Sequence, residues 1–403
     1  MVVRSALSGR RAVLCLRSTQ TSATQLAFPQ TSLSCSTSVR KSALAIVNGW
    51  RFVNKREIAT PALLVDLDRL EANLSRMAAF FQTVPAKLRP HFKNHKCLQL
   101  AARQLDAGAI GITCATIHEA ECLVQYGVRS VLLANEVVDT GKIRRLVELA
   151  HQSDVIACVD NEKVVDEFAR ASRNGHSPLS VLVDVDVGLH RCGVQPGEAT
   201  LRLAREVLEK GLRLRGLMGY EGHVLHQLPG PEKEDAVMAA MQPLMETKSS
   251  LEREGIPVEI VSVGGTGTYS LSGRYPGVTE VQAGTYLLMD TNYRECCIDF
   301  DLALTVLGTV VSKANKDHVV VDAGVKSLSS ERGLPTVKNP GGLTVRKLNA
   351  EHAVLDLKEA PASIEVGDKI ELWVRYSDAT VNLHHRIYGI RNGHVEEVFT
   401  LSR

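Results

Sequence analysis

Short apolar runs alternate with segments of helical periodicity over most of this chain. Residues 62–68 form an apolar run typical of a buried strand, and residues 69–81 carry apolar side chains at helical spacing. Further helical segments span residues 97–105, 142–150, 199–211 and 234–253. Continuous apolar strands between helices indicate a parallel sheet that is covered on both faces. The eight strands expected in it span residues 87–93, 110–115, 130–135, 154–160, 179–187, 212–220, 259–265 and 279–285.

Eight strands separated by crossover segments predict a closed (β/α)8 barrel of the TIM type. Such barrels typically occupy about 250 residues, which the chain provides before residue 298. The alternative is an open, doubly wound sheet, which would normally have fewer units and a GxGxxG fingerprint after its first strand. That fingerprint is missing here, so the barrel is favoured.

Beyond about residue 298 the pattern changes to strand-like runs separated by turns such as Asn392-Gly393. We therefore expect an α/β protein in which the barrel, residues 57–297, is followed by a smaller β-rich domain, residues 298–403. The segment before residue 62 is expected to pack on this second domain. Its expected strands lie within residues 302–313, 318–324, 343–348, 352–357, 369–376 and 386–401.

The first 56 residues differ from the rest in charge. They contain no Asp or Glu, while Arg and Lys are spread among many Ser and Thr residues. This composition is typical of a transit peptide, and we exclude residues 1–56 from the fold prediction. The arginines favour the mitochondrion over the plastid. The alternative is a disordered basic tail without a targeting role, in a cytoplasmic protein.

The overall composition excludes several classes of function. A net charge of +2 provides no electrostatic footprint for nucleic acid. No apolar run approaches the roughly 20 residues of a membrane-spanning helix. The nine cysteines are scattered without a CxxC pair, which favours a reducing compartment over a disulfide framework. A protein that binds a small molecule is therefore expected, with neither nucleic acid nor a membrane as its partner.

Two Gly/Thr-rich stretches follow the last two expected barrel strands. They are "GGTGTYS" at residues 264–270 and "AGTYLLMD" at residues 283–290. Functional residues of such barrels gather at the C-terminal ends of the strands, and phosphate often binds after the seventh and eighth. Either stretch alone is more often just a tight turn. Together, at both expected positions, they predict a phosphate site built from backbone N–H groups and hydroxyls.

The stretch "RPHFKNHKC", residues 89–97, ends the first barrel strand and contains Lys93. An amine at this strand end faces the same mouth as the phosphate site, and in apolar or cationic surroundings it can form a Schiff base. A phosphate site with such a lysine predicts pyridoxal 5'-phosphate as cofactor. The alternative is a solvated loop lysine, which suits Lys96 better. His91 and His95, four residues apart, are expected to surround Lys93 and line the mouth rather than to bind a metal, with His95 a catalytic candidate.

Two further strand ends carry candidate residues. Arg191 follows the fifth strand and could hold the phenolic oxygen of the cofactor, or it could instead pair with Asp184 or Asp186. Tyr220, Glu221 and His223 follow the sixth strand at the rim. A histidine there is a candidate proton carrier, although a structural histidine is an equal alternative.

Seven motifs in order carry a family resemblance from Thr60 to the C-terminus: "TPALLVDLDRLEANL", "RPHFKNHK", "VDVGLHRCGV", "GGTGTY", "VQAGTYLLMD", "DAGVKSLSSERGLP" and "TVNLH". The chain resembles the D-threonine aldolase and D-serine dehydratase family of fold-type III pyridoxal phosphate enzymes, distant relatives of the bacterial alanine racemases. The resemblance implies a barrel and a β domain in a homodimer with active sites at its interface. It matches Lys93 to the Schiff-base lysine and Arg191 to a cofactor contact, and it places Tyr220 or His223 beside the ring or substrate. The matching phosphate-binding residues are Gly265, Thr266, Gly267, Thr268, Gly284, Thr285 and Tyr286.

The sequence departs from the family at a metal position. The resemblance implies a divalent metal held by a His-x-Asp or His-x-Cys pair before a TVN-like segment, where it would polarise the substrate's β-hydroxyl. Here Asp378 occupies the second position, but Tyr376 stands in place of the histidine. Tyrosine is a poor ligand at neutral pH because its hydroxyl ionises only near pH ~10. A metal would need Asp378 together with another side chain, such as His384 or His352.

The resemblance leads to a lyase that acts on a D-configured β-hydroxy amino acid. Retro-aldol cleavage to glycine and an aldehyde is preferred, because Asp378 matches the His-x-Asp form of the metal pair. A dehydratase would instead yield an oxo acid and ammonia. A non-catalytic cofactor-binding protein would explain the altered metal pair, but such relatives are commonly a lone barrel. Racemisation would need a second base, which the sequence does not identify.

Overall fold

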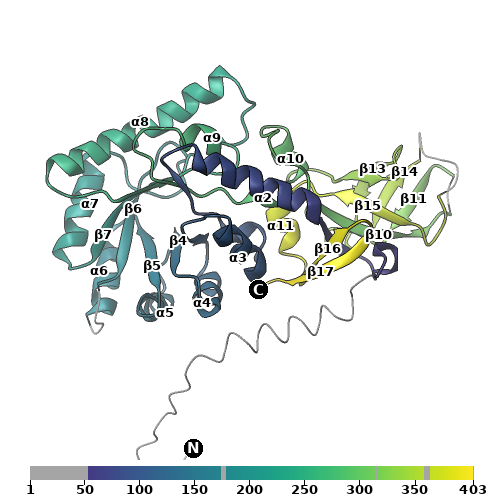
Figure 1. Cartoon of the computed structure of the whole chain (residues 1–403), viewed down its shortest axis with the longest axis horizontal. Coiled ribbons are helices and arrows are strands. Elements are labelled where there is room, and N and C mark those ends of the chain that lie inside the picture. Colours follow the sequence, from purple (N-terminus) through teal and green to yellow (C-terminus); the bar gives the residue numbers. More distant parts are fainter. Residues whose placement is uncertain (1–52, 174–177, 315, 358–363, 403) are drawn as a thin grey trace, which may run out of the picture. The chain divides into compact units, whose positions relative to one another are not determined.

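The computed structural model describes residues 53–173, 178–314, 316–357 and 364–402 (Figure 1). The expected transit peptide, residues 1–56, lies almost wholly outside these described residues. Within them, no helix is long and apolar enough to cross a membrane.

Eight parallel strands form the predicted barrel, in the order β2-β9-β8-β7-β6-β5-β4-β3. The ring continues from β2 to β3 through a parallel bridge between His91 and Thr113, where the Thr113 N–H also donates to the Pro90 carbonyl at 2.9 Å. The prediction of a barrel followed by a β-rich domain is therefore confirmed. The strands are β2 (Lys87–Leu88), β3 (Ile112–Cys114), β4 (Ser130–Glu136), β5 (Asp154–Val159), β6 (Ser180–Asp184), β7 (Arg213–Gly219), β8 (Ile260–Val263) and β9 (Glu280–Val281).

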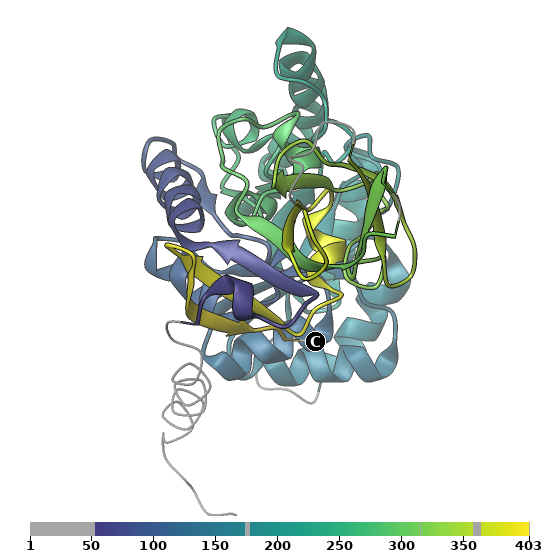
Figure 2. The same cartoon turned by 90° about the vertical axis from the view of Figure 1, so that its right-hand side faces the viewer.

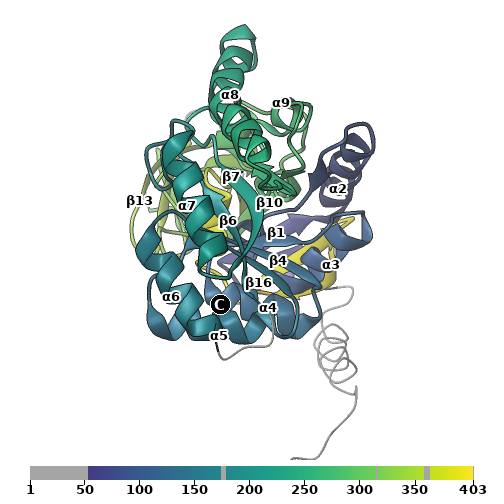
Figure 3. The same cartoon turned by 90° about the vertical axis from the view of Figure 1, so that its left-hand side faces the viewer.

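Helices cover the outside of these strands, as Figure 3 shows for α4 to α7. Several begin at a polar cap: the side chains of Asp66, Thr116, Asp139 and Asn161 accept N–H groups in the first turns of α2, α4, α5 and α6. The long helix α8 begins with Pro231, whose fixed φ suits the first helical position. The helices are α2 (Leu67–Gln82), α3 (Leu98–Asp106), α4 (Ile117–Tyr126), α5 (Thr140–Ala150), α6 (Glu162–Ser172), α7 (Glu198–Glu209), α8 (Pro231–Arg253), α9 (Tyr269–Ser272) and α10 (Thr291–Arg294).

Both faces of the barrel strands are buried, which explains their continuous apolar runs. Side chains such as Leu132, Ile156 and Leu182 form one small cluster, while their strand neighbours pack in the large cluster that includes the helices. Since strand residues alternate sides, the small cluster fills the inside of the barrel. All five residues of β6 are buried.

The second domain is a mixed sheet with the order β13-β14-β11-β10-β1-β16-β17, in which β15 also pairs with β10 and β12 pairs with β15. Strand β1 (Ala62–Asp66) falls in the range 57–297 expected for the barrel, yet it pairs with β10 and β16 of this sheet (Figure 2). Strand β12 was not anticipated. The other strands are β10 (Leu304–Ser312), β11 (His318–Val321), β12 (Thr336–Asn339), β13 (Thr344–Leu348), β14 (Ala353–Asp356), β15 (Lys369–Trp373), β16 (Arg386–Arg391) and β17 (His394–Thr400).

A short helix of the second domain, α11 (Ser377–Val381), is hydrogen-bonded to the barrel. The buried Asp290 carboxylate accepts from the Ser377 N–H and hydroxyl, both at 2.8 Å. The buried Asn94 amide donates to Ser377 Oγ at 2.9 Å and to Asp378 Oδ1 at 2.6 Å. These bonds hold Asp378 close to the end of the first barrel strand.

Candidate active site

A cavity of about 430 Å³ lies at the C-terminal ends of the barrel strands. Its barrel wall, as we name it, comprises Lys93, Gly265, Thr266, Gly284 and Thr285. Its rim comprises His226 and, from the second domain, Arg332, Tyr376 and Asp378. Except for Lys93, the wall residues are buried, whereas all four rim residues are partly or fully exposed.

Lys93 lies in this cavity on the short 3-10 turn η2 (Phe92–Asn94), beyond the end of β2. Its amine has no hydrogen-bond or ion-pair partner in the described part of the chain. His91 lines the cavity next to it, and burial and then the charge of Lys93 lower the pKa of His91 well below its usual value. His91 is therefore neutral near pH 7. An uncharged imidazole forms no ion pair with a ligand, and the Lys93 amine stays unpaired between the buried neighbours that the structure describes.

His95 does not line the cavity, in contrast to the expectation for it. The 3-10 turn ends the alternation of a strand and directs His95 into the interior, where its Nε2 lies 3.1 Å from Gln104 Oε1. Burial lowers the pKa of His95 to about 4. The same Gln104 donates to the Tyr286 hydroxyl at 2.9 Å, so Tyr286 also lies in the core and outside the cavity lining. Lys96 is paired with Glu119 at 2.7 Å.

The two predicted phosphate loops meet at the barrel wall, where Gly265, Thr266, Gly284 and Thr285 line the cavity. No acceptor among the described residues reaches the main-chain N–H groups of Thr266, Gly284 or Thr285. A Cβ on Gly284 would lie 2.9 Å from the His91 carbonyl oxygen, so only glycine fits there. These free N–H groups suit a phosphate anion. The other two predicted residues, Gly267 and Thr268, lie behind the lining.

Glu221 fixes the first of these loops. It is completely buried, and its carboxylate accepts from the Gly264 N–H at 2.9 Å, from Thr268 Oγ1 at 2.7 Å and from Ser272 Oγ at 2.5 Å. Sequence reasoning placed this residue at the rim without a role. An acidic residue at a strand end gave no sign that its partners would come from the next loop.

Arg191 also lines the cavity, with its guanidinium carbon 5.3 Å from the centroid of the Tyr220 ring. It forms no ion pair with Asp184 or Asp186, the alternative considered for it; Asp186 instead contacts His190 at 2.8 Å. Burial and then the charge of Glu221 raise the pKa of Tyr220, so its phenol stays protonated. The guanidinium is thus available to a bound molecule.

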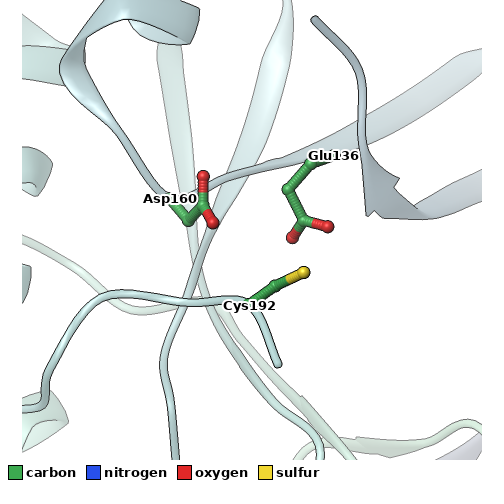
Figure 4. A group of neighbouring side chains, drawn as sticks. All are labelled: Glu136, Asp160 and Cys192. Carbon is green, nitrogen blue, oxygen red and sulfur yellow. The ribbon is translucent and has the colours of Figure 1, made fainter. Parts of the chain in front are cut away.

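Three polar side chains cluster near Arg191. Glu136, Asp160 and Cys192 each offer a ligand atom within 4.8 Å of the others (Figure 4), a spacing that could hold a cation. Glu136 also neighbours Asp184. Burial and Glu136 raise the pKa of Asp184 to about 8 and that of Cys192 to about 11, so protons compete with a cation here. Near neutral pH Asp184 therefore keeps its proton and donates it in a hydrogen bond to Glu136.

The histidine that lines the cavity after β7 is His226 rather than His223. His223 is exposed and lies beside Gly188, where an added Cβ would be 3.2 Å from the imidazole. His226 packs on Tyr293 with 4.6 Å between ring centroids, and its Nδ1 lies 3.3 Å from Asn292 Nδ2. Sequence reasoning missed it because turns follow the strand, and their geometry decides which side chain faces inward.

The residues present fit pyridoxal phosphate. The barrel wall provides unpaired N–H groups for a phosphate, the Lys93 amine for the aldehyde, and Arg191 beside it. They do not fit the divalent metal that the family resemblance implies. The phenol of Tyr376 stays protonated, because burial and then Asp378 raise its pKa to about 12.

Comparisons with known proteins agree with this arrangement. The alanine racemase N-terminal domain family matches residues 65–292, and a serine dehydratase domain family matches residues 303–390. A D-threonine aldolase of Arthrobacter sp. is 35% identical over 86% of this chain and 92% of its own length. A 3-hydroxy-D-aspartate aldolase of Paracoccus denitrificans is 32% identical over 87% and 93%.

The structure is similar as well. The crystal structure of D-threonine aldolase from Filomicrobium marinum superposes with a TM-score of 0.84 at 32% identity, covering 87% of this chain and 97% of the other. The chain therefore belongs to the D-threonine aldolase and D-serine dehydratase family, and it is a lyase of the pyridoxal phosphate type.

Proposed function

We propose that this lyase cleaves a D-configured β-hydroxy amino acid by a retro-aldol reaction, giving glycine and an aldehyde. One observation carries the choice of reaction: two side chains at the rim, His226 and Asp378, are of a kind that can accept a proton. Partial burial and then the charge of Arg332 lower the pKa of His226, and Asp378 lies at the same rim. Retro-aldol cleavage needs a base for the β-hydroxyl proton, whereas elimination needs that hydroxyl to leave as water or on a metal.

Each residue has a distinct part in this reaction. Pyridoxal phosphate supplies a carbonyl that condenses with amines and a ring that takes up the electron pair of the broken Cα–Cβ bond. The loops of the barrel wall and Arg191 hold the cofactor. His226 or Asp378 accepts the β-hydroxyl proton. The Lys93 amine is placed in the cavity to return a proton to the α-carbon.

The products distinguish the candidate reactions. Holoenzyme would be incubated with D-threonine, D-serine and 3-hydroxy-D-aspartate, and the products would be separated and quantified. We expect glycine in equal amount to the aldehyde, without ammonia. Ammonia with an oxo acid would show a dehydratase instead. Bound cofactor without turnover of any of the three would favour a protein that only binds the cofactor.

A further inference from the structure

The rim carries a guanidinium without an anionic partner. Arg332 lies in the loop between β11 and β12, lines the cavity and is exposed. Its guanidinium carbon lies 5.6 Å from the centroid of the Tyr376 ring. No carboxylate of the described residues forms an ion pair with it.

The backbone of this loop is held in place by Arg375. The Arg375 side chain donates to the Arg332 carbonyl at 3.0 Å and to the Thr291 carbonyl at 3.2 Å, and it pairs with Glu295 at 2.6 Å. Arg332 therefore starts from a fixed main chain, and only its own side chain must be ordered when a ligand binds. That lowers the entropic cost of using it as a binding group.

The neighbouring position is poorly suited to a cation. A tyrosine hydroxyl stands where a histidine ligand would be needed, and one Asp378 oxygen already accepts from Asn94 at 2.6 Å. The histidines considered as substitute ligands do not line the cavity: His384 Nε2 contacts the Ser327 carbonyl at 2.8 Å, and His352 is exposed. A divalent ion would find one carboxylate and would be repelled by the Arg332 guanidinium.

The charges that line the cavity favour an anionic ligand at the rim. Among the described residues that line it, the basic groups are the guanidiniums of Arg191 and Arg332 and the Lys93 amine, and the one carboxylic side chain is Asp378. His91 and His226 have lowered pKa values and add no charge near pH 7. Arg191 lies on Tyr220 near the barrel wall and Lys93 is assigned to the cofactor aldehyde, so Arg332 is the basic group that remains for the substrate. Its planar fork matches a carboxylate, which it can hold by two parallel hydrogen bonds.

We propose that Arg332 binds a second carboxylate, carried on the β-carbon of the substrate, at the place where the family resemblance implies a metal. The Tyr376 hydroxyl, beside Arg332 in the cavity lining, is a second donor to the same group. The substrate class is then a D-amino acid with a β-hydroxyl and two carboxylates, of the 3-hydroxy-D-aspartate type. This inference rests on the proposed function, because it assumes that a D-amino acid binds at the cofactor.

A binding experiment tests it without turnover. D-Aspartate and D-asparagine lack the β-hydroxyl, have nearly the same shape and differ in one charge. Each is titrated into holoenzyme, and the dissociation constant is taken from the change in the visible absorption of the cofactor. We expect D-aspartate to bind at least about tenfold tighter, as is typical of a hydrogen bond to a charged group.

Variants assign that preference to a residue. Arg332→Met should bring the ratio of the two dissociation constants to about one, and Arg332→Lys should restore part of it. Arg202→Met, an exposed arginine on α7, is the matched control and should keep the full ratio. An equal affinity of the wild-type protein for both ligands, or a preference that survives in Arg332→Met, would overturn the proposal while leaving the lyase assignment intact. The absence of any spectral change with either ligand would contradict both.

A further experiment distinguishes binding of the carboxylate by the Arg332 guanidinium from binding by a metal cation. The preference for D-aspartate should persist after treatment with EDTA, and the dialysed protein should contain no stoichiometric divalent metal by elemental analysis. If chelation removes the preference and Mn²⁺ or Zn²⁺ restores it, a metal rather than Arg332 supplies the charge.

Discussion

The barrel wall and the rim of the cavity are built in different ways. At the wall, Glu221 ties the loop from Gly264 to Ser272 by three hydrogen bonds, and the wall glycines fit closely against the Leu225 side chain and the His91 backbone. At the rim, His226 and Arg332 are exposed side chains with few partners. A rigid wall suits a cofactor that stays bound. A rim of adaptable side chains suits a substrate that binds and is released in every turnover. At the rim, the replacement of the family's histidine by Tyr376 changes the chemistry without disturbing the fold.

Removal of the wall amine should have the largest effect. In Lys93→Ala, we expect the visible absorption of the lysine-bound cofactor to disappear and kcat to fall by at least about 10²- to 10⁴-fold, the usual range for loss of a proton-transfer group. Spectra and single-turnover assays measure both. Lys96→Ala is the control, because Lys96 is engaged with Glu119 rather than with the cavity. A band that survives in Lys93→Ala would disprove the assignment of the lysine.

Removal of the rim base should have the next largest effect. If His226 accepts the β-hydroxyl proton, His226→Gln should lower kcat by about 10²-fold or more while the cofactor spectrum is unchanged. His223→Gln is the matched control, since His223 does not line the cavity. Equal activity of the two variants would exclude His226 as the base and leave Asp378.

The pH profile reports on the same histidine. Because a base must be unprotonated, activity is lost as the pH falls through the pKa of His226, which partial burial and Arg332 hold below the usual value. Arg332→Met removes the second of these causes. Its acid limb should therefore move to higher pH than that of wild type, while Arg202→Met should leave the limb in place. An unshifted limb in Arg332→Met would mean that another group titrates.

The wall can be loosened without touching the cavity. In Glu221→Ala, three buried donors lose their acceptor, at about 1–3 kcal/mol for each. We expect weaker cofactor binding, by about tenfold or more, and a lower melting temperature. Equilibrium dialysis and thermal unfolding measure these. Glu209→Ala, on the exposed face of α7, should change neither. Unchanged cofactor affinity in Glu221→Ala would show that the loop keeps its shape without the carboxylate.

The fold was predicted well from the sequence, because the alternation of an apolar strand with a segment of helical periodicity is repeated in every strand–helix unit. It could not place β1, since Leu63 and Leu64 pack into different clusters and a strand buried on both faces has the same pattern in either sheet. The cavity lining was harder to predict. His91 and Lys93 were placed correctly in it, but the 3-10 turn after them directs His95 inward. Residues such as His226 and Arg332 lie in loops, where no periodicity shows which way a side chain points.

The smallest expected effect concerns Asp184, which ends β6 and is 5% exposed. Burial and then Glu136 raise its pKa to about 8 in the folded protein, from a value near 3.8. Between these two pH values the folded protein holds a proton that the unfolded chain has released. The free energy of unfolding must therefore fall as the pH rises through this window, by an amount that reflects up to about one proton.

Asp184→Asn removes that contribution while its amide can still donate to Glu136, so its melting temperature should decline less between pH ~6 and ~9 than that of wild type. The exposed Asp235→Asn should keep the wild-type slope. Equal slopes in all three proteins would show that Asp184 is ionised in the folded protein and carries a buried charge.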